Sequence, residues 1–185
     1  MVALSTPETD LGTPAPDFSL PDPSGKVWTL ADCSGVNGTL VMFICNHCPY
    51  VQAVIDRIVR DCRELDDHGV GCVAIMSNDV SRYPADAPDR MTAFATEHHL
   101  TIPYLYDESQ SVARAYGAVC TPDFFGYDGD LKLRYRGRLD ASRAEPAPPE
   151  AERELFVAMA TIAAGSPAPA VQLPSMGCSI KWKET

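Results

Sequence analysis

The sequence predicts an α/β fold in which a central mixed β-sheet is flanked by helices. Residues 39–44 and 71–76 are compact apolar runs, which is typical of strands buried on both faces of a sheet. Between them, apolar residues recur at helical spacing over residues 49–68, as in an amphipathic helix. Residues 131–136 alternate apolar and basic side chains, as a half-exposed strand does. Strands that alternate with helices in this way favour a mixed sheet covered by helices.

The N-terminal part of the sequence predicts a β-hairpin extension. Residues 17–20 and 26–30 are short strand-like stretches, and residues 21–25 between them are rich in turn formers. Residues 1–16 are polar and proline-rich, which favours a loose arm. With 185 residues, of which 45% are apolar, the chain is long enough for one domain with its own core. We therefore expect an arm over residues 1–16, one domain over residues 17–170, and a tail over residues 171–185 that packs back on the domain.

The later elements follow from local signals of helix ends and turns. Gly69 lies just past the helix expected over residues 49–68, and glycine is the usual residue after a helix. Asp128 and Gly129 form a dipeptide that is typical of a hairpin turn. Residues 77–88 are rich in turn formers and predict a surface loop. The remaining expected elements are helices over residues 89–100, 109–116 and 151–164 and a strand over residues 102–106.

Composition and charge exclude several classes of function. The formal net charge is −10, and an acidic chain repels phosphate backbones, so we expect no nucleic-acid partner. No apolar stretch approaches the roughly 18 residues of a membrane span, so no membrane partner is expected. Residues 1–12 carry neither the basic residues nor the apolar stretch of a secretory signal, which favours a cytoplasmic location.

Seven cysteines are the most informative feature of the composition. Their odd number excludes a complete disulfide framework within one chain, and close cysteine spacing in a reducing compartment indicates redox catalysis or metal binding. We interpret Cys33, Cys62 and Cys72 as core or surface residues without a redox role, since Cys62 falls on the apolar face of the first long helix and Cys72 in a strand.

Cys45 and Cys48 form a C-x-x-C motif where a buried strand hands over to a helix. The first turn of a helix has unpaired N–H groups and a partial positive charge, which lower the pKa of a thiol from about 8.5 toward 3.5–7.5. We expect Cys45 to be the exposed nucleophile near the helix start and Cys48, one turn in, to resolve the mixed disulfide. Pro49 fits the first helical turn, where its missing N–H costs nothing.

His47 lies between the two cysteines, and a charged imidazole there favours a thiolate and a more oxidising couple. The motif also fits half of a metal site, in which Cys45, Cys48 and His47 hold copper(I) or zinc. A zinc site needs two further ligands, and the sequence has no second C-x-x-C and no H-x-x-x-H. We therefore expect redox chemistry, with no metal and no cofactor.

Thr121 and Pro122, which precede an expected strand, resemble the corresponding dipeptide of the thioredoxin superfamily. The resemblance implies a thioredoxin fold, with Pro122 in the cis form opposite the C-x-x-C motif. It also implies that the backbone of Thr121 pairs with an extended substrate. We accordingly predict substrate contacts from Thr121 and from Asn46, within the motif.

Further motifs resemble the peroxiredoxin and TlpA/ResA-like branch of this superfamily. They are the opening stretch over residues 12–20, the C-N-H-C-P-Y-V block over residues 45–51, and residues 77–79, 120–124 and 177–182. Together they are similar to uncharacterised peroxiredoxin-like proteins of the thioredoxin family. The resemblance implies redox roles for Cys45 and Cys48, the cis form for Pro122, and an antioxidant context.

The sequence departs from these relatives at three places. Peroxiredoxins have a threonine or serine three residues before the reactive cysteine, where this chain has Met42, so the hydroxyl that orients a peroxide is missing. Thioredoxins have a tryptophan before the first cysteine, where this chain has Ile44. The strand over residues 39–44 also lacks the buried carboxylate that thioredoxins use for proton transfer. Proton transfer must then come from His47, from water or from elsewhere in the chain.

Two further cysteines are candidates for redox roles. Cys120 precedes Thr121 and should lie near Cys45, either as a third redox thiol or as a small buried apolar residue. Cys178 lies in a tail with little packing reason for a cysteine, so it either folds back to resolve Cys45, pairs between subunits, or has no redox role.

We thus predict a thiol–disulfide oxidoreductase that acts on protein or small-molecule disulfides and depends on a thiol reductant system. Two alternatives remain open. One is a thiol peroxidase in which Cys45 reacts with peroxide and Cys48 or Cys178 resolves it. The other is a non-enzymatic thiolate carrier of copper(I) or zinc.

Overall fold

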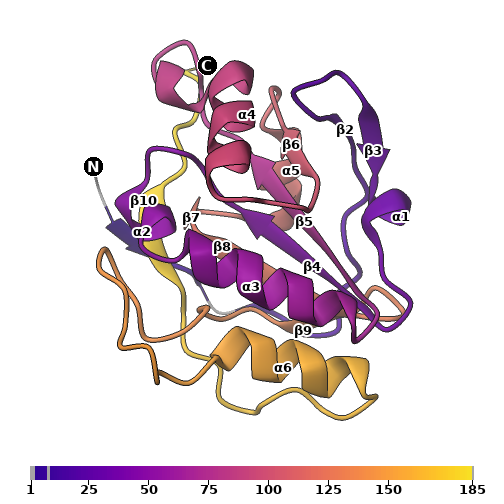
Figure 1. Ribbon diagram of the computed structural model, residues 1–185. Coiled ribbons are helices and arrows are strands. Elements are labelled where there is room, and N and C mark those ends of the chain that lie inside the picture. Colours follow the sequence, from indigo (N-terminus) through magenta and orange to yellow (C-terminus); the bar gives the residue numbers. More distant parts are fainter. Residues whose placement is uncertain (1–2, 8, 185) are drawn as a thin grey trace.

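The computed structural model describes residues 3–7 and 9–184 and confirms the α/β fold with a mixed sheet (Figure 1). The central sheet has five strands in the order β6-β5-β4-β8-β9. β4, β5 and β6 are parallel, whereas β8 and β9 run antiparallel to β4 and β8 respectively. The strands are β4 (Gly38–Phe43), β5 (Val70–Met76), β6 (Tyr104–Tyr106), β8 (Asp123–Asp128) and β9 (Leu133–Tyr135).

Two apolar clusters cover the two faces of this sheet. Successive side chains of a strand point to opposite faces of the sheet. In β4, Leu40 and Met42 accordingly belong to one cluster, and Val41 and Phe43 belong to the other. Three helices pack on the first face: α3 (Ile55–Asp66), α4 (Pro88–Glu97) and α6 (Glu154–Ala163). The second face is covered by α1 (Leu30–Cys33), α5 (Ser111–Tyr116) and the predicted N-terminal hairpin of β2 (Ser19–Pro21) and β3 (Val27–Thr29).

The helix expected over residues 49–68 is two helices, so the prediction of one continuous helix was wrong. The chain forms α2 (Pro49–Gln52), leaves the helical conformation at Val54, and resumes in α3. Val51, Val54 and Ile55 are all buried. The apolar periodicity therefore continues across the break at Val54, and the sequence pattern does not indicate that the helix is interrupted there.

The two ends of the chain meet in a second, three-stranded sheet with the order β1-β10-β7. It comprises β1 (Ala3–Ser5), β10 (Met176–Ser179) and β7 (Cys120–Thr121). Both pairings are antiparallel, so the tail packs back on the domain and the described part of the N-terminal arm is held rather than loose. Pro14 also forms a bridge with Lys132. The domain boundaries at residues 16 and 170 stay predictions.

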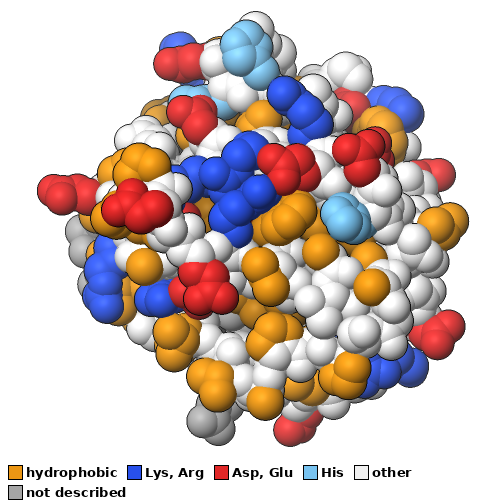
Figure 2. All heavy atoms as spheres, turned by 60° about the horizontal axis from the view of Figure 1, so that its bottom comes forward, with side chains coloured by type: hydrophobic (Ala, Val, Ile, Leu, Met, Phe, Trp, Pro, Cys, Tyr) orange, Lys and Arg blue, Asp and Glu red, His pale blue; other side chains and the backbone are white. Residues whose placement is uncertain are grey.

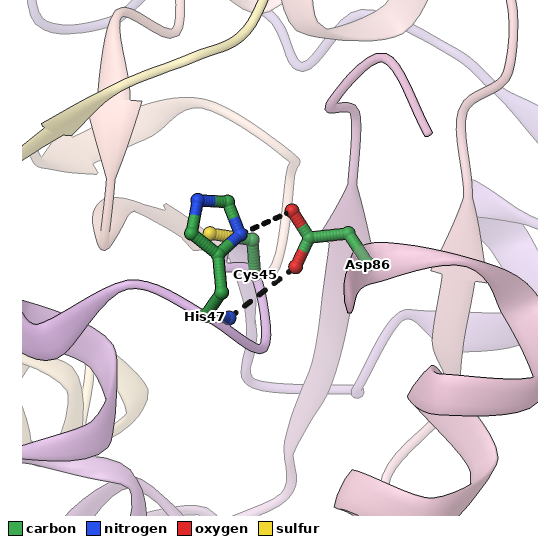
Figure 3. A group of neighbouring side chains, drawn as sticks. All are labelled: Cys45, His47 and Asp86. Atoms are coloured by element: carbon green, nitrogen blue, oxygen red, sulfur yellow. Dashed lines mark hydrogen bonds and ion pairs between the residues drawn. The ribbon is translucent and has the colours of Figure 1, made fainter. Parts of the chain in front are cut away.

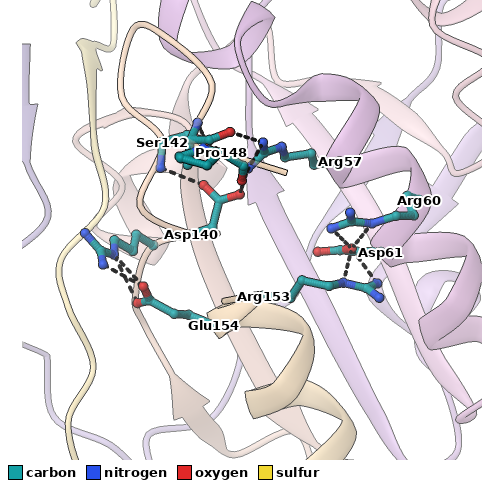
Figure 4. Close-up of polar contacts among 10 residues, drawn as sticks. Arg57, Arg60, Asp61, Asp140, Ser142, Pro148, Arg153 and Glu154 are labelled. Atoms are coloured by element: carbon teal, nitrogen blue, oxygen red, sulfur yellow. Dashed lines mark hydrogen bonds and ion pairs between the residues drawn. The ribbon is translucent and has the colours of Figure 1, made fainter. Parts of the chain in front are cut away.

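Ion pairs join the first-face helices to the segment before α6 (Figure 4). Arg57 of α3 pairs with Asp140, and Arg153 pairs with the buried Asp61 of α3 at 2.6 Å. On the face that carries α6, basic and acidic side chains lie beside one another, with hydrophobic atoms scattered between them (Figure 2). Among the described residues, no helix has the length and apolar character needed to span a bilayer.

Candidate active site

The C-x-x-C motif lies at the end of β4, where the chain turns into α2. Cys48 is the N-cap of α2 and Pro49 occupies the first turn, as expected. Cys45, however, lies three residues before the N-cap, so the prediction that Cys45 lies near the helix start and Cys48 one turn inside the helix was wrong. The helix start is closer to Cys48, which therefore receives its favourable electrostatic effect.

Both cysteines are buried, Cys45 with 1% and Cys48 with 0% of its surface exposed. The expectation of an exposed Cys45 was therefore wrong. Thr121 lies against both sulfurs: its hydroxyl oxygen is 3.3 Å from the Cys45 sulfur, and its carbonyl oxygen accepts a hydrogen bond from the Cys48 thiol at 3.1 Å. The peptide bond between Thr121 and Pro122 is cis, as predicted. The cis-proline segment thus closes one side of the dithiol.

The two thiols contact each other and titrate as a pair. The pKa of Cys45 is raised, first by its hydrogen bond with Cys48 and then by burial and the negative charge of Asp86. The same hydrogen bond lowers the pKa of Cys48 to about 5, although burial acts in the opposite direction. Hydrogen bonds from Cys178 and Thr121 add to the lowering. The hydrogen bond between the two thiols therefore favours the first ionisation of the pair at Cys48 rather than at Cys45.

A buried carboxylate, Asp86, faces the motif from the 3-10 helix η1 (Pro84–Asp86). Its side chain lies 2.7 Å from Nδ1 of His47 and accepts the backbone N–H groups of Asn46 and His47 at 2.9 and 3.3 Å (Figure 3). Asn78 donates a further hydrogen bond to it at 2.8 Å. Burial would raise the pKa of Asp86, but the hydrogen bonds from His47 and Asn78 outweigh it, and the pKa is lowered.

Asp86 in turn sets the charge of His47. The hydrogen bond from the ring to Asp86 raises the pKa of His47, against the opposing effect of burial. The ring also stacks on Tyr83, with centroids 5.7 Å apart. Its Nε2 is buried and has no hydrogen-bond partner among the described residues. An imidazolium with one free N–H beside a dithiol is suited to deliver a proton to a departing thiolate.

The prediction of a plain surface loop over residues 77–88 missed this carboxylate. The sequence carried one usable signal: because β4 and β5 are parallel neighbours, the residues that follow them emerge at the same edge of the sheet. The segment after Met76 should therefore lie near Cys45, which follows β4. The buried carboxylate absent from β4 is supplied by the segment after β5.

The comparisons with known proteins agree with this geometry. The sequence model described as the AhpC/TSA family matches residues 11–136, more than half of the chain. The chain belongs to the AhpC/TSA family. An uncharacterized conserved protein from Geobacillus kaustophilus is 45% identical, with a TM-score of 0.95 over 100% of this chain and 98% of that one. A hypothetical protein from Sinorhizobium meliloti is 38% identical, with a TM-score of 0.93 over 98% of this chain and 99% of that one.

A more distant match shows the fold alone. A secreted disulfide oxidoreductase from Mycobacterium tuberculosis is 16% identical, with a TM-score of 0.59 over 80% of this chain and 95% of that one. No curated protein matches the sequence significantly. These findings confirm the thioredoxin fold and a peroxiredoxin-like member of the thioredoxin superfamily, and the family supports a thioredoxin-like redox function for this AhpC/TSA protein.

The other predicted site residues, Asn46, Cys120 and Cys178, differ in their contacts within the AhpC/TSA protein. Asn46 is buried, donates to the Ala85 carbonyl and accepts from the Tyr104 hydroxyl, so its contact with substrate stays a prediction. Cys120 is fully buried, and burial raises its pKa far above the ordinary range, so it is not an ionised thiol. Cys178 lies in β10 opposite Thr121 and is among the groups that lower the pKa of Cys48, so its redox role stays a prediction.

The set of potential metal ligands differs from the predicted one. Within the described ranges, the ligand atoms that come within 4.8 Å of one another belong to Cys45, His47 and Asp86, and Cys48 is outside this group. The Asp86 oxygens already accept four hydrogen bonds, which satisfies the lone pairs of a carboxylate. The donor set therefore suits proton transfer better than binding of a soft metal ion, which prefers several thiolates.

Proposed function

We propose that this AhpC/TSA protein is a thiol–disulfide oxidoreductase that cycles between the Cys45–Cys48 dithiol and its disulfide. The observation that carries the proposal is the burial of both sulfurs against Thr121, whose hydroxyl oxygen lies 3.3 Å from the Cys45 sulfur and whose carbonyl oxygen accepts from the Cys48 thiol at 3.1 Å. The lowered pKa of Cys48 supports a thiolate within this pair. A thiolate is the attacking species in disulfide exchange, and a neighbouring thiol is its resolving partner.

The charge distribution assigns the order of events. The Cys48 thiolate attacks one sulfur of a substrate disulfide, a mixed disulfide forms, and the other half of the substrate leaves as a thiolate. Cys45 then loses its proton and attacks the Cys48 sulfur, so that the second half leaves and the Cys45–Cys48 disulfide remains. One substrate disulfide thus becomes two thiols, and an external thiol reductant restores the dithiol. This order exchanges the roles predicted from the sequence, because the helix start and the hydrogen-bond donors favour charge on Cys48.

His47 and Asp86 provide the protons for this cycle. The protonated His47 donates through Nε2 to the departing thiolate, and Asp86 holds the ring and keeps it charged. The raised pKa of Cys45 also requires a base in the second step, and the neutral imidazole left after the first step meets this need. The cytoplasm, where thiol reductants are abundant, stays the predicted location.

A peroxidase is the second candidate, and one contact favours it. The hydroxyl that is missing at Met42 has a counterpart in Thr121, whose hydroxyl oxygen lies 3.3 Å from the Cys45 sulfur. A hydroxyl at this distance is able to orient a peroxide. The pKa directions favour disulfide exchange instead, since that of Cys45 is raised and that of Cys48 is lowered.

Activity of single-cysteine variants tests the proposal. We expect Cys45→Ser and Cys48→Ser each to lose at least about 100-fold in turnover of bis(2-hydroxyethyl) disulfide, because each removes half of the couple. Cys33→Ser is the matched control, since Cys33 is also buried but lies in the cluster on the other face of the sheet. Retention of multiple-turnover activity by Cys48→Ser would contradict the proposal. Hydrogen peroxide consumption faster than disulfide turnover would favour the second candidate.

A further inference from the structure

The C-terminal strand β10 covers the dithiol and is fixed there along its length. It pairs antiparallel with β7, with Cys178 opposite Thr121 and Ser179 opposite Cys120, and Ile180 donates to the Val119 carbonyl at 3.1 Å. On its other edge, Cys178 lies opposite Ala3 of β1. The backbone edge of Thr121, at which the sequence predicts an extended substrate to bind, is therefore already paired within the protein.

The fit between β10 and the cis-proline segment depends on Gly177. A Cβ atom at this position would overlap the carbonyl oxygen of Thr121, so only glycine allows the two backbones to approach this closely. Ser175, just before β10, donates its hydroxyl to the Pro122 carbonyl at 2.7 Å. After β10, the Lys181 N–H donates to Asn78 and its carbonyl accepts from Gln110. The strand is thus anchored on both sides of the site.

This arrangement places a third thiol against the couple. Cys178 lies opposite Thr121 in the ladder, the Cys48 thiol donates to the Thr121 carbonyl at 3.1 Å, and Cys178 is only 3% exposed. Cys178 is also among the groups that lower the pKa of Cys48. The pKa of Cys178 is raised to about 12 by burial and by the neighbouring Cys48. Because antiparallel partners share a face of the sheet, Cys178 and Thr121 point together toward the dithiol, whereas Cys120 lies on the other face of the ladder.

We propose that Cys178 is a third redox cysteine that exchanges with Cys48, and that β10 restricts the site to small disulfides. The proposal rests on the proposed disulfide exchange. When the Cys45–Cys48 disulfide has formed, the Cys178 sulfur attacks Cys48, the Cys48–Cys178 bond forms, and the Cys45–Cys48 bond breaks. The proton of Cys178 passes to Cys45, so the number of thiols and disulfides is unchanged and no further oxidant is needed. The exchange frees Cys45, while the buried disulfide remains linked to β10.

The restriction to small substrates follows from the burial of both sulfurs and from the pairing of β10 along the backbone edge of Thr121. A disulfide within a polypeptide brings its own backbone to the site, and that backbone needs the space and the hydrogen bonds that β10 occupies. A small disulfide needs only a local opening. The same strand therefore excludes large substrates and supplies an internal partner for Cys48.

Disulfide mapping tests the exchange. The wild-type protein and its variants are oxidised with bis(2-hydroxyethyl) disulfide, quenched in acid, alkylated and mapped by mass spectrometry. We expect both Cys45–Cys48 and Cys48–Cys178 linkages in the wild type, only Cys48–Cys178 in Cys45→Ser, and only Cys45–Cys48 in Cys178→Ser. Cys120→Ser, which changes the neighbouring buried thiol on the other face, should match the wild type. One result for the Cys45→Ser variant would overturn the proposal: Cys48 remains in a mixed disulfide with the reagent, and Cys178 is still alkylated as a free thiol.

The same maps separate this proposal from the proposed function. A wild-type protein that forms no Cys45–Cys48 disulfide contradicts the proposed function, whereas one that forms it without any Cys48–Cys178 linkage contradicts only the role of Cys178. For the restriction to small substrates, we expect turnover of bis(2-hydroxyethyl) disulfide to exceed that of insulin by at least about tenfold. The Gly177→Ala variant displaces β10. Where this variant folds, its ratio of bis(2-hydroxyethyl) disulfide turnover to insulin turnover should be smaller than that of the wild type. An equal rate on the two substrates in the wild type would overturn the restriction.

Discussion

Cys45 and Cys48 form one contacting pair of thiols, and Cys62 and Cys72 form another in the same apolar cluster. Cys62 lies within α3 and Cys72 within β5, away from any helix start. The pKa of Cys62 is raised, by its hydrogen bond with Cys72 and by burial. At the first pair, by contrast, the pKa of Cys48 falls to about 5.

The difference between the two pairs lies in their polar neighbours. Cys48 is the N-cap residue of α2, its thiol donates to the Thr121 carbonyl, and the hydrogen-bonding groups of Cys45, Cys178 and Thr121 lower its pKa. The pair in α3 and β5 is surrounded by the apolar side chains of the core. Contact between two thiols is therefore not sufficient for redox chemistry: a thiolate needs donors that replace the water lost on burial.

The largest expected contrast between the pairs is in ionisation. The ultraviolet absorption of thiolate, followed against pH, should show one thiolate that forms as the pH rises through about 5 and is absent in Cys48→Ser. At neutral pH we expect this thiolate to be populated roughly 30-fold more than one with the ordinary pKa. In Cys45→Ala the midpoint should rise, because the main hydrogen bond that lowers the pKa is lost.

Cys62→Ala is the control for this titration and should leave the curve unchanged. Activity should follow the ionisation of Cys48. Disulfide exchange should slow as the pH falls below about 5, because Cys48 then takes up a proton. A thiolate that appears only near the ordinary pKa of cysteine would remove the distinction between the two pairs.

The fold and the motif could be predicted from the sequence because their signals are local. The strand of residues 39–44, the turn at Asp128 and the cis-proline at Pro122 each depend on neighbouring residues or on a short motif. The burial of Cys45 and Cys48 could not be predicted, because both sulfurs lie against Thr121, and Thr121 is paired with a strand that begins at Met176. Contacts between segments so far apart leave no trace in the pattern of either one.

The second contrast concerns two buried carboxylates, Asp86 at the active site and Asp61 beside Cys62. Asp86→Asn should lower disulfide turnover about tenfold, because His47 loses the partner that raises its pKa and is less often protonated at neutral pH. The alkaline limb of the pH–rate profile should move to lower pH for the same reason. Asp61→Asn should weaken the ion pair with Arg153 and lower stability, with the pH profile unchanged.

These two substitutions are matched in chemistry and in burial, so their difference isolates the effect of position. A merely structural role for Asp86 would reduce the amount of folded enzyme without moving the pH profile. If Asp86→Asn and Asp61→Asn shift the profile by the same amount, His47 is not the proton donor.

The smallest expected effect is that of a substitution in the Cys62–Cys72 pair. Cys62→Ala removes one buried sulfur from the cluster between α3 and β5, and we expect the free energy of unfolding, measured in urea, to fall by about 1 kcal/mol. Disulfide turnover should stay within about twofold of the wild type, because Cys62 touches neither the dithiol nor the segments that hold it. A larger change in turnover, or in the reduction potential of the Cys45–Cys48 couple, would mean that the two pairs exchange electrons. In that case the polar neighbours of the Cys45–Cys48 pair would not decide which pair reacts, because a pair without such neighbours would also take part in exchange.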